Sequence, residues 1–181
     1  MRVRRQTVQF NPEGNAWVDV TAFTGLLREQ STPIANRQTF QRLQEAVELY
    51  QGDFLTGFSL PDSAAFEEWA LLTREQLRRQ ALTALQHLVE HCEEEDESQR
   101  GLEYAWRQVE MDPLREGAQR QLMRLLALNG QWEAALAQYE GYRRLLETEL
   151  GVAPSPETQE TFELLLRGEL PSRPPTVIRV L

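Results

Sequence analysis

Residues 128–139 read LNGQWEAALAQY, and this stretch decides the fold. Asn129 and Gly130 are typical of the end of one helix, because glycine readily adopts the left-handed conformation that closes a helix. The residues that follow place Ala135 and Tyr139 four positions apart, on one face of a second helix. The stretch therefore predicts two helices joined by a tight turn.

The sequence around this turn repeats itself at an interval of 34 residues. The matched pairs are Ala84 and Ala118, Leu88 and Leu122, Gly101 and Ala135, Leu102 and Leu136, and Ala105 and Tyr139. Small residues such as Gly101 are expected where paired helices approach most closely, and Pro113 follows it by twelve residues. This pattern resembles the tetratricopeptide repeat. We predict an all-α, tetratricopeptide-like right-handed helical repeat of about seven helices, with a short N-terminal β-hairpin.

Start and stop signals place the helices along the chain. We expect starts at the capping residue Asp62 and at the cap-then-proline pairs 112–113 and 155–156, and a stop at Gly151. The predicted helices cover residues 22–28, 38–51, 62–92, 98 or 99–111, 113–129, 131–150 and 156–167.

The two ends and one connector of the chain differ from this helical pattern. Residues 6–10 and 16–20 are rich in β-branched and aromatic residues and flank a cluster of turn formers, which predicts a hairpin. The connector 53–59 is too apolar to lie in water, so we expect it to fold back onto the core. The tail 171–181 is rich in proline and indicates a linker.

The composition favours a globular protein that works without nucleic acid as its direct ligand. The net charge is −9, whereas DNA binding depends on basic residues that neutralise phosphates. Cys92 is the single cysteine, so an internal disulfide is impossible and a cytoplasmic location is expected. We find no apolar run of about 18 residues, the length expected of a membrane-spanning helix, and no signal peptide.

Several stretches together resemble the bacterial transcriptional activation domain, the tetratricopeptide-like domain of antibiotic-pathway-type winged-helix regulators. They are AVELYQGDFL at 46–55, EWA at 68–70, REQLR at 74–78, PLRE at 113–116, QLM at 121–123 and YRRLLETELGVAPSPET at 142–158. The resemblance covers about residues 17–167. It implies that residues 1–20 end a winged-helix DNA-binding domain, that 21–168 form the activation domain, and that 169–181 lead to an absent domain.

Residues 87–91 spell H-x-x-E-H, the inverted zinc-peptidase motif, beside Cys92. A metal-dependent hydrolase built on His87, Glu90 and His91 is therefore one alternative, but these are the only two histidines and no third ligand is indicated. We find neither a glycine-rich phosphate loop nor a Ser–His–Asp arrangement, and we expect no enzymatic activity and no cofactor.

The candidate partner-binding residues are basic or aromatic side chains on the predicted helices. They are Arg74, Arg78, Arg115, Arg124, Tyr139 and Arg143. The alternative is that the arginines pair with nearby glutamates, for example Arg79 with Glu75. Clustering in space distinguishes the two.

We predict a protein–protein interaction module of a bacterial transcriptional regulator, mediating activation, self-association or interdomain control. The expected partner is RNA polymerase or a second copy of the chain, and DNA is contacted only through the absent winged-helix domain. The alternative is a generic tetratricopeptide scaffold unrelated to transcription.

Overall fold

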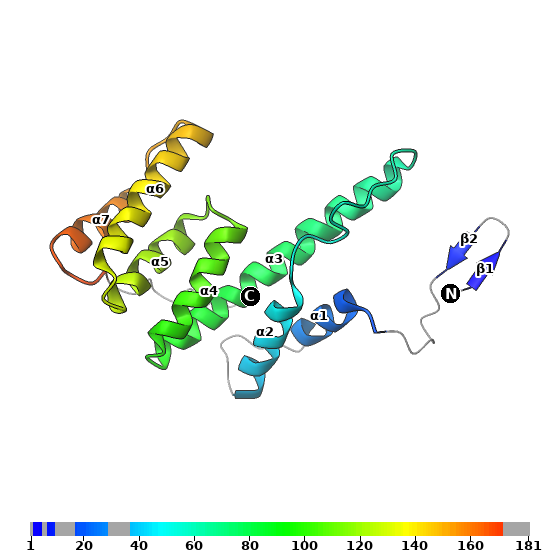
Figure 1. The fold of residues 1–181 in the computed structure, drawn as a ribbon, viewed down its shortest axis with the longest axis horizontal. Coiled ribbons are helices and arrows are strands. Elements are labelled where there is room, and N and C mark those ends of the chain that lie inside the picture. Colours follow the sequence, from blue (N-terminus) through cyan, green and yellow to red (C-terminus); the bar gives the residue numbers. More distant parts are fainter. Residues whose placement is uncertain (1, 5–6, 10–16, 29–36, 172–181) are drawn as a thin grey trace, which may run out of the picture. The chain divides into compact units, whose positions relative to one another are not determined.

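The computed structural model describes residues 2–4, 7–9, 17–28 and 37–171. These residues form seven α-helices: α1 (Asp19–Arg28), α2 (Arg37–Leu49), α3 (Ala64–Glu94), α4 (Ser98–Met111), α5 (Glu116–Leu128), α6 (Trp132–Leu150) and α7 (Pro156–Leu166) (Figure 1). The prediction of an all-helical core is confirmed. The chain divides within α3 into an N-terminal unit, Met1–Arg74, and a C-terminal unit, Glu75–Leu181.

The predicted hairpin over residues 6–20 is wrong. Strand β1 (Arg2–Arg4) pairs antiparallel with β2 (Thr7–Gln9), and the proposed second strand at 16–20 runs into α1. The amide of Ala22 bonds to the carbonyl of Val18 at 3.0 Å, which adds a turn before the predicted start. Asp19 favours this helix start, because a carboxylate interacts well with the positive end of the helix dipole. Residues 10–16 of the predicted hairpin lie outside the described residues.

In the N-terminal unit, α1 and α2 pack against each other. Phe23 of α1 is buried and its ring lies 5.9 Å from that of Tyr50, just after α2. The buried positions of α2 recur at helical spacing, at Phe40, Leu43 and Val47. They confirm the helix predicted for residues 38–51, which in the structure runs from Arg37 to Leu49.

The connector between α2 and α3 folds back onto the first turns of α3. The ring of Phe54 meets Trp69 edge-on at 5.4 Å, and that of Phe58 meets Phe66 at 5.7 Å. Phe58 nevertheless remains 50% exposed, so the connector covers α3 without becoming fully buried itself.

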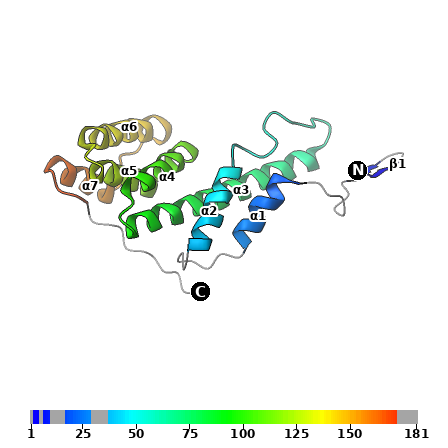
Figure 2. The same ribbon diagram turned by 60° about the horizontal axis from the view of Figure 1, so that its bottom comes forward.

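The C-terminal unit is built around α5, which packs against α4, α6 and α7 (Figures 1 and 2). Leu122, Met123 and Leu125 of α5 are fully buried in the hydrophobic core. A helix covered on several sides needs apolar residues over more than one face, and α5 carries them beside a polar stripe formed by Glu116, Arg120 and Arg124.

The 34-residue interval predicted from the sequence aligns α3 with α5 and α4 with α6. Leu88 and Leu122, which are 34 residues apart, are both fully buried. Gly101 lies at a close approach, because a Cβ added there would stand 3.2 Å from the Cβ of Cys92 on α3. The expectation that small residues mark close helix contacts is confirmed at Gly101.

Helix ends follow the predicted signals at the C-terminal side of the chain. Gly151 adopts a left-handed conformation with φ of 66° after α6, and Ser155 followed by Pro156 begins α7. Two predicted starts are wrong. Ser63, not Asp62, accepts the first amide bonds of α3, from Phe66 and Glu67.

The second wrong start concerns the helix expected at Pro113, because α5 begins at Glu116. Asp112 instead ends α4, and its carbonyl accepts the amide of Arg115 at 3.2 Å. Pro113 thus occupies the second position of a four-residue turn, where its fixed φ is favourable.

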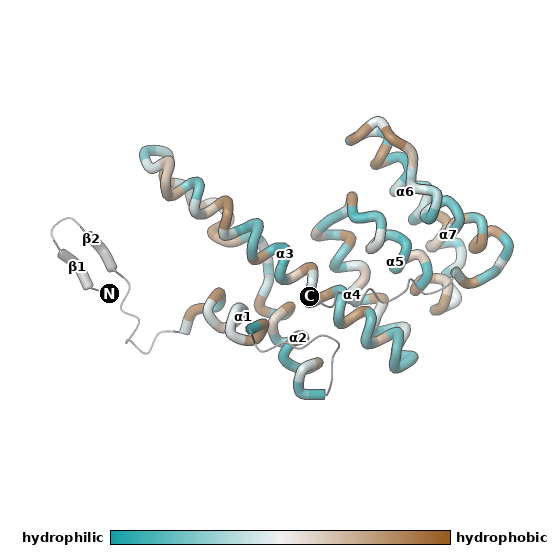
Figure 3. Tube along the Cα trace, turned by 180° about the vertical axis from the view of Figure 1, so that it is seen from behind, coloured by the Kyte–Doolittle hydropathy of each residue, from teal (hydrophilic) through white to brown (hydrophobic). Residues whose placement is uncertain are grey.

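None of the helices in the described ranges is long and apolar enough to cross a membrane. Figure 3 shows hydrophilic and hydrophobic stretches alternating along the helices.

Candidate functional site

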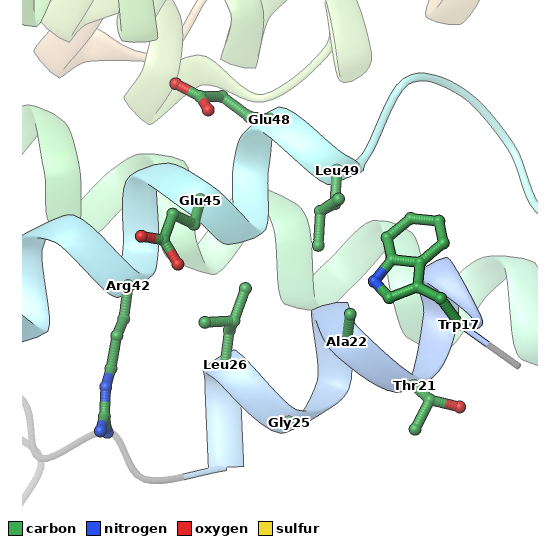
Figure 4. Close-up of a pocket in the computed structure, with 9 residues that line it drawn as sticks. All are labelled: Trp17, Thr21, Ala22, Gly25, Leu26, Arg42, Glu45, Glu48 and Leu49. Carbon is green, nitrogen blue, oxygen red and sulfur yellow. The ribbon is translucent and has the colours of Figure 1, made fainter. Parts of the chain in front are cut away.

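A groove of about 630 Å³ lies between α1 and α2 in the N-terminal unit (Figure 4). It is lined by Trp17, Thr21, Ala22, Gly25 and Leu26 on the α1 side and by Arg42, Glu45, Glu48 and Leu49 on α2. Gly25 leaves the α1 wall open, because even a Cβ added there would meet nothing within 4 Å. The size is within the range of about 300–1,000 Å³ typical of binding pockets.

The largest apolar side chain of the groove, Trp17, lies at one end of it. Figure 4 shows the indole of Trp17 beside Leu49, with Ala22 and Leu26 along α1. Trp17 is 72% exposed, although an indole of this size is normally covered in a folded protein. The groove therefore offers a large aromatic surface that the described residues leave open.

The polar part of the groove is carried by α2. Glu45 and Glu48 are exposed and three residues apart, which places them on neighbouring positions of the helix surface. Within the described part of the chain, neither carboxylate takes part in an ion pair or hydrogen bond. Arg42 lies one turn before Glu45, at the other end of the groove (Figure 4).

The C-terminal unit has a second polar feature, a series of side-chain contacts that joins α3, α5 and α7, here called the polar ladder. Its members are Gln86, Glu93, Arg115, Glu116, Arg120, Gln121, Arg124, Ser155 and Thr158.

Between α3 and α5, the polar ladder consists of three contacts. Arg115 donates to the Oε1 of Gln86 at 2.5 Å. Gln121 donates to Glu93 at 3.2 Å, and Arg124 forms an ion pair with the same carboxylate. The Glu93 side chain is only 2% exposed, so this pair is buried and tightly bound to the fold.

Arg124 also fixes the chain beyond α7. Its Nε donates to the carbonyl of Pro171 at 3.0 Å, and Pro171 is buried. One guanidinium thus joins α5, the end of α3 and the segment that follows α7.

Between α5 and α7, the polar ladder centres on the carboxylate of Glu116. Ser155 donates its backbone N–H at 2.8 Å and Thr158 its hydroxyl at 3.2 Å, while Arg120 lies 3.5 Å away. Burial alone would raise the pKa of Glu116, but the hydrogen bonds from Ser155 and Thr158 outweigh it and hold that pKa below its usual value. The carboxylate therefore stays ionised and holds the first turn of α7.

The structure places the six predicted partner-binding residues in different surroundings. Arg74 belongs to the N-terminal unit, where it donates to the carbonyls of Phe54 at 2.6 Å and Leu55 at 3.1 Å. It holds the connector onto α3. Arg78 donates to the carbonyl of Met111 at 2.5 Å, next to the α4–α5 turn that also carries Arg115.

The other predicted residues lie on α5 and α6. Arg124 belongs to the polar ladder. Tyr139 is buried and its ring stacks on Phe162 of α7 at 4.0 Å. Burial raises the pKa of Tyr139, so the phenol stays neutral. Arg143 is 46% exposed and pairs with Glu140 through contacts of 3.0 and 3.2 Å.

Residues of the H-x-x-E-H motif contact one another within α3. Glu90 accepts a bond from Gln86 at 2.9 Å and lies 3.5 Å from the Nδ1 of His87. Across the described ranges, no group of three side chains with suitable ligand atoms is placed to hold a metal ion. Burial raises the pKa of the Cys92 thiol to about 11, so it stays protonated and unreactive at neutral pH.

Sequence reasoning missed Trp17 and Glu93. The sequence predicts a strand at Trp17. The one signal for an exposed ring is its position just before the start of α1. Glu93 belongs to an acidic run, and such runs usually face water. The sequence carries no signal for the pairing of Glu93 with Arg124, because 31 residues separate the two.

These features define a class of protein, an all-helical regulatory or binding module. Its polar ladder joins its own helices, and its α1–α2 groove is open to a partner. The chain belongs to the family described as the bacterial transcriptional activator domain, which matches residues 18–166. That family consists of regulatory domains and not of enzymes, so the chain is a module of the bacterial transcriptional activator type. No curated protein matches the chain.

Proposed function

We propose that this chain is the protein-interaction module of a bacterial transcriptional regulator, acting in the cytoplasm beside a DNA-binding domain. Its match to the activator family supports the link to transcription. The observation that carries the interaction role is the α1–α2 groove, which has the exposed indole of Trp17 at one end and two glutamates along its α2 wall. Exposed aromatic side chains in a groove are typical of protein recognition sites.

The paired helices support a tetratricopeptide-like arrangement, for which we propose a right-handed sense. In such repeats, neighbouring helix pairs bury a shared core and leave extended surfaces for partners. The proposed domain plan keeps residues 1–20 as the end of a winged-helix domain, 21–168 as the activation domain and 169–181 as a linker. DNA is then contacted by the winged-helix domain and not by this acidic chain.

The proposed partner is RNA polymerase or a second copy of the chain. Arg74, Arg78, Arg115, Arg124, Tyr139 and Arg143 remain proposed contacts. Arg143 is well suited to contact a partner, because its ion pair with Glu140 is exposed and weak. A partner's carboxylate can therefore take the place of Glu140. The alternative, a scaffold unrelated to transcription, is disfavoured by the family match.

A reporter assay tests the proposal. The full 181-residue chain is fused to an unrelated DNA-binding domain. Transcription is then measured in bacteria from a promoter that carries the operator of that DNA-binding domain. We expect several-fold more transcription than with the DNA-binding domain alone at equal expression. Equal transcription from the two proteins, with the fusion shown to occupy the operator, would reject the activating role.

A further inference from the structure

We infer that the α1–α2 groove binds a cationic amphipathic helix of a partner protein, with an apolar side chain on Trp17 and Lys or Arg beside Glu45 and Glu48. This inference rests on the proposed function and names the chemistry of its partner. Three observations carry it: the apolar end of the groove, the position of its carboxylates, and the small number of residues that line it.

The apolar end of the groove matches one or two side chains of a helix. Trp17 is 72% exposed and lies beside Leu49 of α2, with Ala22 next along the α1 wall (Figure 4). A buried aromatic side chain removes about 150–250 Å² from water, so covering Trp17 is a strong driving force. Helices commonly dock in this way, with apolar residues at intervals of three or four in a groove.

The carboxylates fix the charge of the partner. Glu45 and Glu48 lie along the α2 wall, and their carboxylates accept no hydrogen bond or ion pair from the described residues. A Lys or Arg one turn away from the apolar anchor would reach them, and the face of Trp17 also attracts a cation.

The extent of the groove favours a single helix over a second copy of this chain. Nine residues line it, whereas a stable protein interface has about 20–30 residues on each side. The net charge of −9 also makes two copies repel each other. A short cationic segment fits both limits.

Fluorescence anisotropy with two synthetic peptides tests the inference. One probe is a labelled amphipathic helix with leucines on one face and lysines beside them, and its twin carries glutamate in place of every lysine. We expect the full chain to bind the lysine peptide at least tenfold more tightly. Trp17→Ala should weaken this binding about tenfold.

Charge reversal identifies the binding site. The double variant Glu45→Lys with Glu48→Lys should no longer bind the lysine peptide and should instead bind the glutamate twin. The matched control is Glu160→Lys with Glu163→Lys, which makes the same charge change at the same spacing on the exposed surface of α7. Circular dichroism verifies that each variant folds. If Glu45→Lys with Glu48→Lys unfolds, Glu45→Gln with Glu48→Gln replaces it and is expected to weaken binding of the lysine peptide.

Three results would overturn the inference. The first is that the groove variant and the α7 variant weaken binding of the lysine peptide equally, which would mean that the peptide is attracted by the overall charge of the chain. The second is that the lysine peptide does not bind. If the reporter fusion still activates transcription in that case, the proposed function is retained and only the assignment of the groove is rejected. The third is a wild-type dimer in sedimentation velocity that the groove variant dissociates, which makes a second copy the occupant.

Discussion

The α1–α2 groove and the polar ladder use the same kinds of side chain in opposite ways. In the groove, Glu45 and Glu48 stand at the surface without a bonded partner among the described residues. In the polar ladder, Glu93 and Glu116 are bound by arginine, hydroxyl or amide groups from other helices. The difference teaches that a charge in this chain supports the fold where it is bonded and is available for recognition where it is not.

The largest effect is expected in the core behind the polar ladder. Leu122→Ala removes a fully buried side chain of α5 and leaves a cavity, which should lower the free energy of unfolding by about 3 kcal/mol. Urea unfolding followed by circular dichroism measures it. A loss below about 1 kcal/mol would show that the C-terminal unit is less tightly packed around α5 than the burial of this side chain indicates.

Arg124→Gln should have the next largest effect. It leaves the buried carboxylate of Glu93 without Arg124 and should lower the free energy of unfolding by roughly 2 kcal/mol, because Gln121 still donates to that carboxylate and the guanidinium is itself 18% exposed. Arg143→Gln makes the same charge change at an exposed pair on α6 and should cost less than about 0.5 kcal/mol.

A double-mutant cycle separates the pair from other effects of Arg124. Glu93→Gln combined with Arg124→Gln should show a coupling free energy of roughly 1–3 kcal/mol. Strict additivity of the two single changes would mean that Arg124 acts through Pro171 and not through Glu93.

Glu116→Gln should lower the free energy of unfolding by about 1 kcal/mol at pH 7, because the amide accepts the α7 hydrogen bonds less well than the carboxylate. The folded-state pKa of Glu116 lies below its unfolded value, so the carboxylate's stabilisation is present above the unfolded pKa of about 4.3 and is lost as pH falls through the folded pKa. The difference between wild type and variant should therefore shrink on acidification below about pH 4. Chemical unfolding across the range from about pH 7 to about pH 3 measures it, and a constant difference would contradict this role.

The smallest effect is expected in the groove. Glu45→Gln with Glu48→Gln should change the free energy of unfolding by less than about 0.5 kcal/mol, because neither carboxylate is bonded in the described structure. Thermal unfolding beside the wild type tests it. A loss comparable with that of Arg124→Gln would remove the distinction between the groove and the polar ladder.

The sequence predicted the helices of the C-terminal unit well, because their ends carry local signals. Gly151 and the Ser155–Pro156 pair act within a few residues of the helix end they define. The 34-residue interval also identified buried positions such as Leu88 and Leu122, since repeated packing requires repeated apolar residues.

The N-terminal strands and the groove were not predicted correctly, for a different physical reason. Val18 and Val20 have strand propensity, but strand propensity depends on context and the start of α1 overrides it. The groove depends on how α1 and α2 pack, and no short motif encodes the pairing of Trp17 with Leu49. In the sequence the arginines form one set, yet only the structure distinguishes Arg124, which is 18% exposed and pairs with the buried Glu93, from the more exposed Arg143.

The bond from Arg124 to Pro171 also has a mechanical consequence. Without it, the last contact of the chain with α7 would be at Glu169, whose amide bonds to the carbonyl of Leu164 at 2.9 Å. With it, the held part of the chain extends two residues further, which shortens the span beyond α7 by up to roughly 7 Å. In the proposed domain plan, residues 169–181 link this chain to a further domain, and a shorter link would raise the local concentration of that domain, so one guanidinium on α5 would adjust how often the two meet.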